Sequence, residues 1–214
     1  MKLGSKNSGF TLIEMMLVLA IVVLLVSMIV GIAKRVDDQG KERLCRDTIA
    51  LIGNALEQFR DFGYVYKNPN FAGLTFPLDC NGFIEASLVI DFNAELGTGT
   101  CPALICSPPA HNQQNSGSEA LYLFLSQVPN CRKTIDKIDK SLIASTGTIN
   151  IDCIDRPLTR FIDPWGTALR YRYYEVDGGM VPIPATKKTF PVITSAGPDK
   201  TFDTSDDISN IQKK

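Results

Sequence analysis

The segment Gly9-Phe10-Thr11-Leu12-Ile13-Glu14 opens a long apolar stretch near the N-terminus. The stretch continues without a charge through residues 15–33, MMLVLAIVVLLVSMIVGIA. As an α-helix, these nineteen residues would measure about 28 Å, close to the thickness of the hydrocarbon core of a bilayer. Every face of the helix would be apolar, which favours lipid over a half-buried position on a globular domain. We therefore predict a single transmembrane helix at residues 10–33.

The nine residues before this helix carry Lys2 and Lys6 and no acidic residue. A basic N-terminal end favours the cytoplasmic side, so the rest of the chain is expected on the outer side. Lys34 and Arg35 follow the apolar run, so the charge rule alone leaves the orientation open. A secretory signal peptide is the alternative, but its apolar region would be shorter and would end at an A-x-A-like cleavage site, which does not follow here.

Glu14 interrupts the apolar pattern at its beginning. A carboxylate at the centre of a bilayer costs about 2.5–3.5 kcal/mol on insertion scales, and it costs less near the interface. Two interpretations follow. Glu14 is either tolerated because it lies near the interface, or it has a cationic partner.

The basic leader, the GFTLIE sequence and the apolar run together resemble the class III signal of type IV prepilins and type II secretion pseudopilins. The resemblance covers about the first thirty residues. It implies a leader at residues 1–9, cleavage between Gly9 and Phe10 by a prepilin peptidase, and N-methylation of Phe10. Cleavage would create an α-amine with a pKa of about 7.7–8.0, which is positive at neutral pH. Glu14 of one subunit could neutralise that amine on a neighbour and so set the register of a homopolymer.

Apolar residues recur with a helical period after the apolar run, with charged residues between them. We predict that the helix continues as an amphipathic segment at residues 34–62 and that Gly63 ends it. Cys45 falls on the apolar stripe. The stripe is predicted to contain Leu44, Ile49, Ile52, Ala55, Leu56, Phe59 and Phe62.

Six cysteines occur in the chain, and five of them lie in residues 63–160, which we interpret as a variable cysteine-rich insert. In an exported domain an even count favours disulfides. Cys45 is either simply buried on the stripe or, as the even count suggests, tethers the helix to the insert. A zinc site at Cys101, Cys106, His111 and Cys131 is the alternative, but the spacings match no common zinc module. The pairing stays open among the disulfide candidates Cys45, Cys80, Cys101, Cys106, Cys131 and Cys153.

Two short helices are predicted within the same region, at Ser118 to Gln127 with Ser118 as N-cap, and at Cys131 to Ala144. Residues 161–195 alternate in polarity and predict a small antiparallel sheet. The turn Asp163-Pro164-Trp165-Gly166 precedes the first of these strands, with Trp165 expected at the edge of the core. The turn resembles the DPWG turn of the major pseudopilin (G type) of type II secretion systems.

Asp199, Asp203, Asp206 and Asp207 place four carboxylates within nine residues near the C-terminus. Hard oxygen atoms on a turn suit calcium, and a solvated acidic turn is the alternative. The segment resembles the C-terminal calcium loop of major pseudopilins. The resemblance implies a calcium ion held by Asp199, Asp206 and Asp207, with carbonyls near Ser195 and Asp203 completing the shell. Lys200 and Asp203 stand where that family usually has glycine.

We therefore predict an α+β fold: a long N-terminal helix packed on a small antiparallel sheet, with the insert between them and residues 161–214 forming the sheet and the acidic loop. No catalytic motif is found, and a net charge of −1 gives no electrostatic reason to expect nucleic acid. The resemblance implies a structural subunit of a type II secretion pseudopilus that drives protein export. Alternatives are a type IV pilin for adhesion, motility or DNA uptake, and a membrane-anchored periplasmic enzyme or binding module.

The resemblance also implies where the chain works and with which partners. We expect a single-pass inner-membrane protein whose C-terminal domain lies in the periplasm or in an extracellular fibre. The expected partners are further copies of the chain, minor pseudopilins, the prepilin peptidase, and the inner-membrane assembly platform with its ATPase.

Overall fold

The computed structural model describes residues 12–66, 73–77, 113–151, 154–173, 175–176, 182–183 and 188–211. The cleavage site at Gly9 and Phe10 lies outside these residues. So do four of the disulfide candidates and the histidine of the alternative zinc site, namely Cys80, Cys101, Cys106, Cys153 and His111.

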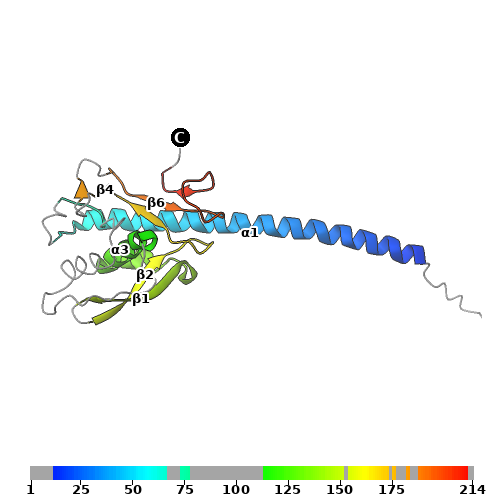
Figure 1. Ribbon diagram of the computed structural model, residues 1–214, viewed down its shortest axis with the longest axis horizontal. Helices are drawn as coiled ribbons and strands as arrows, with labels where there is room; N and C mark the ends of the chain where they lie inside the picture. Colours follow the sequence, from blue (N-terminus) through cyan, green and yellow to red (C-terminus); the bar gives the residue numbers. More distant parts are fainter. Residues whose placement is uncertain are drawn as a thin grey trace, which may run out of the picture. The chain divides into compact units, whose positions relative to one another are not determined.

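The first element is the helix α1, Leu12–Phe62, drawn from blue to cyan in Figure 1. The chain divides into two compact units, residues 1–41 and 42–214, which are described in turn. In the first unit the apolar side chains from Leu12 to Met28 are exposed, and Lys41 forms a 2.8 Å ion pair with Asp37 one turn earlier. Among the described residues, no helix is both long and apolar enough to cross a membrane. The predicted span at residues 10–33 includes side chains outside the described set and stays a prediction.

The part of α1 in the second unit buries one face, as its period predicted. Cys45 and five other residues of the predicted stripe are buried, whereas Leu44 and Phe62 are exposed. The prediction was wrong for these two residues. Leu44 lies next to the buried Cys45 but outside the buried face, and Phe62 is the last residue of the helix, so neither packs in the core. Gly63 ends the helix with a φ of 66° and donates its N–H to the Arg60 carbonyl at 3.0 Å. The buried members of the predicted stripe are Ile49, Ile52, Ala55, Leu56 and Phe59.

The helix predicted at Ser118 to Gln127 is present as α3, Gln113–Gln127, but it starts earlier. Ser118 is therefore not an N-cap. Its buried hydroxyl instead bonds both the N–H and the carbonyl of Phe161, each at 3.0 Å, and so connects α3 to the strand that ends there.

The second predicted helix, from Cys131 to Ala144, is only partly correct. The helix α4 spans Pro129–Ile135, and a single 3-10 turn follows at Lys140–Leu142. Asp139 caps that turn by accepting the N–H of Ser141 at 2.8 Å, which also lowers the pKa of the Asp139 carboxyl. A strand then begins at Ile143 in place of further helix, in a sequence rich in β-branched residues.

Three antiparallel sheets make up the β part of the described chain, which confirms the α+β class. Two strands, β1 (Ile143–Ile151) and β2 (Ile154–Phe161), form a pair in which Ile143 faces Phe161. A three-stranded sheet has the order β3-β6-β7 and brings Tyr171 opposite Ile193. Its strands are Arg170–Arg172, Val192–Ser195 and Ile208–Ser209. The third sheet pairs β4 (Glu175–Val176) with β5 (Pro182–Ile183).

The largest side chains in the core of the second unit are aromatic. Phe59 of α1, Phe124 of α3 and Tyr171 of β3 are fully buried. The Tyr171 hydroxyl donates to the Pro77 carbonyl at 2.8 Å, so this buried polar group is paired. The helix α4 lies against α1, because the Cys131 thiol donates to the Ala55 carbonyl at 3.2 Å.

Candidate functional site

The N-terminal part of α1 presents an apolar surface, which we call the assembly surface. Glu14 lies in the first turn of the helix and is exposed among these apolar side chains. A carboxylate in the first turn is favourable because the helix dipole places partial positive charge there. The assembly surface consists of Leu12, Ile13, Met15, Met16, Leu17, Val18, Leu19, Ile21, Val22, Val23, Leu24, Leu25, Val26 and Met28.

The turn that begins at Asp163 is organised by its own carboxylate. Asp163 is buried, and its Oδ1 accepts the N–H groups of Trp165 at 3.1 Å and Thr167 at 2.8 Å. Gly166 takes a φ of 91°, which favours glycine. Trp165 packs against the core while half-exposed, as expected from the sequence. The other carboxylate oxygen of Asp163 accepts the hydroxyl of Ser195 at 2.7 Å.

The C-terminal acidic loop is tied together by its own carboxylates. Asp206 accepts the hydroxyl of Thr204 at 2.6 Å and the N–H of Asp199 at 3.2 Å. These two hydrogen bonds, the first being the stronger cause, lower the pKa of the Asp206 carboxyl. Asp207 accepts the N–H of Asp203 at 2.9 Å through one oxygen, while its other oxygen is buried without a hydrogen-bond partner.

Asp203 is paired with an arginine of the sheet. Arg170 of β3 donates to both carboxylate oxygens of Asp203, at 3.0 and 3.1 Å, and its guanidinium carbon lies 3.9 Å from the centre of the Phe202 ring. The arginine thus holds the loop by an ion pair and a cation–π contact. Sequence reasoning missed Arg170, since it lies 33 residues before Asp203 and no local pattern links the two.

The two positions at which the calcium loop of major pseudopilins usually has glycine have a left-handed backbone in this chain. Lys200 has a φ of 59° and Asp203 a φ of 70°, and they are the only non-glycine residues with positive φ in the part of the chain that the structure describes. Side chains other than glycine rarely adopt this left-handed conformation. The loop therefore keeps the path of a glycine-containing turn although it carries lysine and aspartate there.

Residues 4–30 match the family model for the prokaryotic N-terminal methylation motif. The motif is that of type IV pilin-like proteins. It indicates cleavage by a prepilin peptidase, methylation of the new N-terminus and anchoring in the cytoplasmic membrane, and proteins of this kind are structural subunits rather than enzymes. No curated protein and no solved structure matches the chain significantly.

Cys45 and Cys131 are free, buried thiols, so the predicted disulfides are wrong for these two residues. Burial raises the pKa of both thiols to about 11, and a hydrogen bond with Ser195 partly opposes the shift at Cys45. Each thiol lies in the core of the second unit, where it packs as a small apolar side chain. The tether expected at Cys45 is replaced by this packing.

A cavity of about 190 Å³ separates the acidic loop from the C-terminal part of α1. Asp206 and Asp207 line it, with Glu42 and Arg46 of α1 across the space. Among the described residues, however, no three Asp, Glu, His or Cys side chains are gathered for a metal ion. Glu42 is bonded to Arg46 at 2.7 Å. The unpartnered oxygen of Asp207 fits a cation, whereas the Asp203 carboxylate is already paired with Arg170. The Ser195 hydroxyl is bonded to Asp163, and a role of the carbonyls near Ser195 stays a prediction.

Proposed function

We propose that this chain is the major structural subunit of a type II secretion pseudopilus. The observation that carries the proposal is the methylation motif at residues 4–30, which leads into the exposed assembly surface with Glu14 in its first turn. The DPWG turn and the acidic loop favour a pseudopilin over a type IV pilin. Both resemble pseudopilin segments, and the left-handed φ values at Lys200 and Asp203 support that resemblance.

Assembly would follow from the chemistry of the N-terminal segment. The helix would first lie in the inner membrane, because the assembly surface is apolar on all sides. Cleavage after Gly9 would create the positive amine of Phe10, and Glu14 of an adjoining copy would neutralise it in lipid. An ion pair formed in a low dielectric is strong when both partners are aligned. The assembly platform and its ATPase would then extend the homopolymer into the periplasm, with minor pseudopilins among its partners.

The test compares Glu14→Ala with a control, Glu57→Ala. The control removes an exposed carboxylate from the part of α1 that lies in the second unit. Glu14→Ala is expected to insert in the membrane and to be processed normally, but to abolish fibres and protein export. Glu57→Ala is expected to behave as the wild type. Normal fibres and export from the Glu14 variant would contradict the ion-pair model. A second outcome would identify a type IV pilin. In that case the Glu14 variant, without fibres, would lose adhesion, motility or DNA uptake and would still export protein.

We also propose that calcium binds at Asp206 and Asp207 beside the cavity facing α1. The buried, unpartnered oxygen of Asp207 supports this, since a buried carboxylate oxygen without a donor is costly. Calorimetric titration of the full chain in detergent should show calcium binding at millimolar concentrations. Magnesium should bind poorly, because it demands a tight octahedral shell. Binding should disappear in Asp206→Ala/Asp207→Ala, and a wild-type titration without heat would overturn the calcium proposal and leave the loop held by its own hydrogen bonds and by Arg170.

A further inference from the structure

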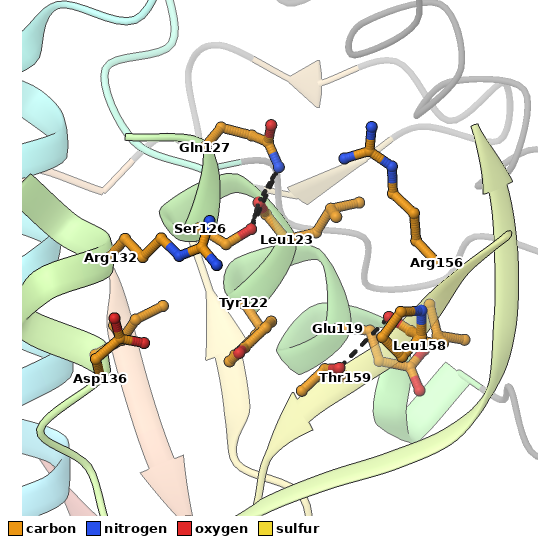
Figure 2. Close-up of a pocket in the computed structure, with 12 residues that line it drawn as sticks. Glu119, Tyr122, Leu123, Ser126, Gln127, Arg132, Asp136, Arg156, Leu158 and Thr159 are labelled. Carbon is orange, nitrogen blue, oxygen red and sulfur yellow. Dashed lines mark hydrogen bonds between the residues drawn. The ribbon is translucent and has the colours of Figure 1, made fainter. Parts of the chain in front are cut away.

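A second cavity, away from α1 and the acidic loop, lies between α3, α4 and β2 of the second unit (Figure 2). Its volume is about 290 Å³, at the lower end of the range for small-molecule sites. One face of α3 lines it, because Glu119, Tyr122, Leu123 and Ser126 recur with helical spacing. The cavity uses no residue of the assembly surface or of the acidic loop.

Two arginines line this cavity from opposite sides. Arg132 comes from α4 and Arg156 from β2, and Figure 2 shows them on either side of Ser126 and Gln127. Within the described part of the chain, neither guanidinium has a hydrogen bond or an ion pair. Asp136, four residues after Arg132, also lines the cavity, so its carboxylate offsets one of the two charges. The remaining positive charge suits a carboxylate, to which a guanidinium can donate two parallel hydrogen bonds.

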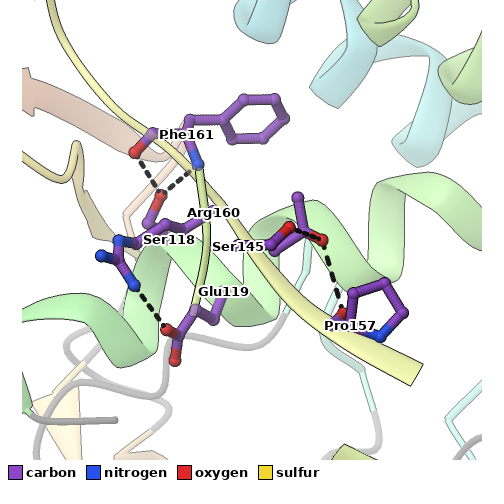
Figure 3. A network of polar contacts seen from close by, with 7 residues as sticks. Ser118, Glu119, Ser145, Pro157, Arg160 and Phe161 are labelled. Atoms are coloured by element: carbon purple, nitrogen blue, oxygen red, sulfur yellow. Dashed lines mark hydrogen bonds and ion pairs between the residues drawn. The ribbon is translucent and has the colours of Figure 1, made fainter. Parts of the chain in front are cut away.

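The other end of the cavity carries a carboxylate paired with an arginine. The Glu119 side chain is fully buried there and accepts from Arg160 of β2 at 3.4 Å (Figure 3). Thr159 lies beside Glu119 in Figure 2. The Tyr122 ring, also in the lining, is placed by its contact with Phe161, with ring centres 5.2 Å apart. Because Arg160 offsets the charge of Glu119, this end is polar without an unpaired charge, which suits hydroxyl groups better than a carboxylate.

The two ends are separated by the geometry of the elements that carry them. Glu119 and Ser126 are seven residues apart on α3, which is about 10 Å along a helix. Arg156 and Arg160 are four residues apart on β2, which is about 13 Å along a strand. Since Arg160 is bonded to Glu119, Arg156 lies toward the Ser126 end. The cavity thus has an end with two arginines and an end with a paired carboxylate, at a separation that suits a small elongated molecule.

We propose that this cavity binds a small hydroxylated organic acid, such as the uronic acid unit of an acidic polysaccharide. The carboxylate lies between Arg132 and Arg156, and the hydroxyl groups point toward Glu119, Thr159 and Tyr122. This binding activity is separate from polymerisation, because the assembly surface belongs to the other unit of the chain.

The test is calorimetric titration of the full chain in a polyoxyethylene detergent, which carries no sugar. The probes are galacturonate, its neutral parent galactose, and acetate. Galacturonate should bind saturably and at least about tenfold more tightly than the other two, since each loses one half of the recognition. Arg132→Gln and Arg156→Gln should each weaken galacturonate binding by about tenfold or more, the effect expected for lost charge-assisted hydrogen bonds.

The matched control is Lys133→Gln, which removes a charge from α4 next to Arg132 without touching the cavity. It should bind galacturonate as the wild type does, and all three variants should still form fibres. Failure of galacturonate to bind at millimolar concentrations would overturn the proposal. So would equal affinity for galactose, equal affinity for acetate, or equal weakening by Lys133→Gln. None of these outcomes bears on the proposed pseudopilus, which is tested by fibre formation and export.

Discussion

The Ser195 hydroxyl donates a 2.7 Å hydrogen bond to the Asp163 carboxylate, and both residues are buried. The contact joins the turn before β3 to the last residue of β6, across 32 positions of sequence. The same hydroxyl accepts the N–H of Gly197 at 3.1 Å, where the acidic loop begins. Two segments that resemble pseudopilin motifs therefore meet in one buried hydrogen-bond network.

Ser195→Ala should destabilise the folded domain by about 1–3 kcal/mol, because it leaves an oxygen of Asp163 and the N–H of Gly197 buried without partners. The free energy of unfolding, measured with urea, checks this. Ser205→Ala, an exposed position in the same loop, should change it by less than about 0.5 kcal/mol. Equal effects of the two changes would show that the network contributes little.

Arg170→Gln should loosen the acidic loop and leave the sheet intact. The change removes the ion pair with Asp203 and the contact with Phe202, while the strand pairing of Tyr171 with Ile193 uses backbone groups. Hydrogen exchange should become faster at the amides of residues 199–207 and stay slow at Ile193. Arg43→Gln, an exposed arginine on α1, is the control and should leave both regions unchanged.

Lys200→Gly should raise the free energy of unfolding by about 0.5–1 kcal/mol, since glycine adopts a φ of 59° without steric cost. Thr201→Gly next to it should lower stability, because Thr201 lacks a positive φ, glycine adds backbone entropy to the unfolded chain, and the change removes the hydrogen bond from the Thr201 hydroxyl to the Asp199 carbonyl. Thermal unfolding of both variants measures the contrast. A loss of stability in Lys200→Gly would mean that its side chain makes a compensating contact.

The thiols of Cys45 and Cys131 should resist alkylation at pH 8 in the native protein and react fully in denaturant. Burial blocks access and raises both pKa values to about 11. Because the folded pKa is raised, the thiols contribute stability that is fully present below the unfolded pKa of about 8.5. This contribution to the free energy of unfolding is lost as the pH rises toward 11. Mass spectrometry of labelled peptides assigns each thiol. A disulfide at either residue would contradict the structure.

The acidic loop should weaken in acid. Hydrogen bonds from Thr204 and from the Asp199 N–H lower the pKa of Asp206, so their stabilisation is present above the unfolded pKa of about 3.9 and is lost as pH falls through the folded value. Asp206→Asn should therefore be less stable than the wild type at pH 6 and nearly equal to it well below pH 4. An equal difference at both pH values would assign the effect to geometry rather than charge.

Local patterns predicted the parts of this protein that depend on neighbouring residues. The 3.6-residue period after the apolar run located the buried face of α1, and Gly63 ends that helix with the φ expected of glycine. The motif around Gly9, Phe10 and Glu14 is a contiguous sequence, so it was recognisable without the fold. Helix periodicity and turn chemistry act over a few residues, which is why these predictions succeeded.

Contacts between distant segments were decided only by the tertiary structure. Ser118 was predicted as an N-cap but bonds Phe161. Asp203 was predicted beside a metal ion but pairs with Arg170. Cys45 was predicted to form a disulfide but packs in the core as a free thiol. In each case a side chain with several possible partners found the one that packing brought near. The sequence determined the apolar helix, its buried stripe and its processing motif. The close packing of α1, α3 and the sheets decided which polar groups meet, because each buried polar group must find a partner within reach.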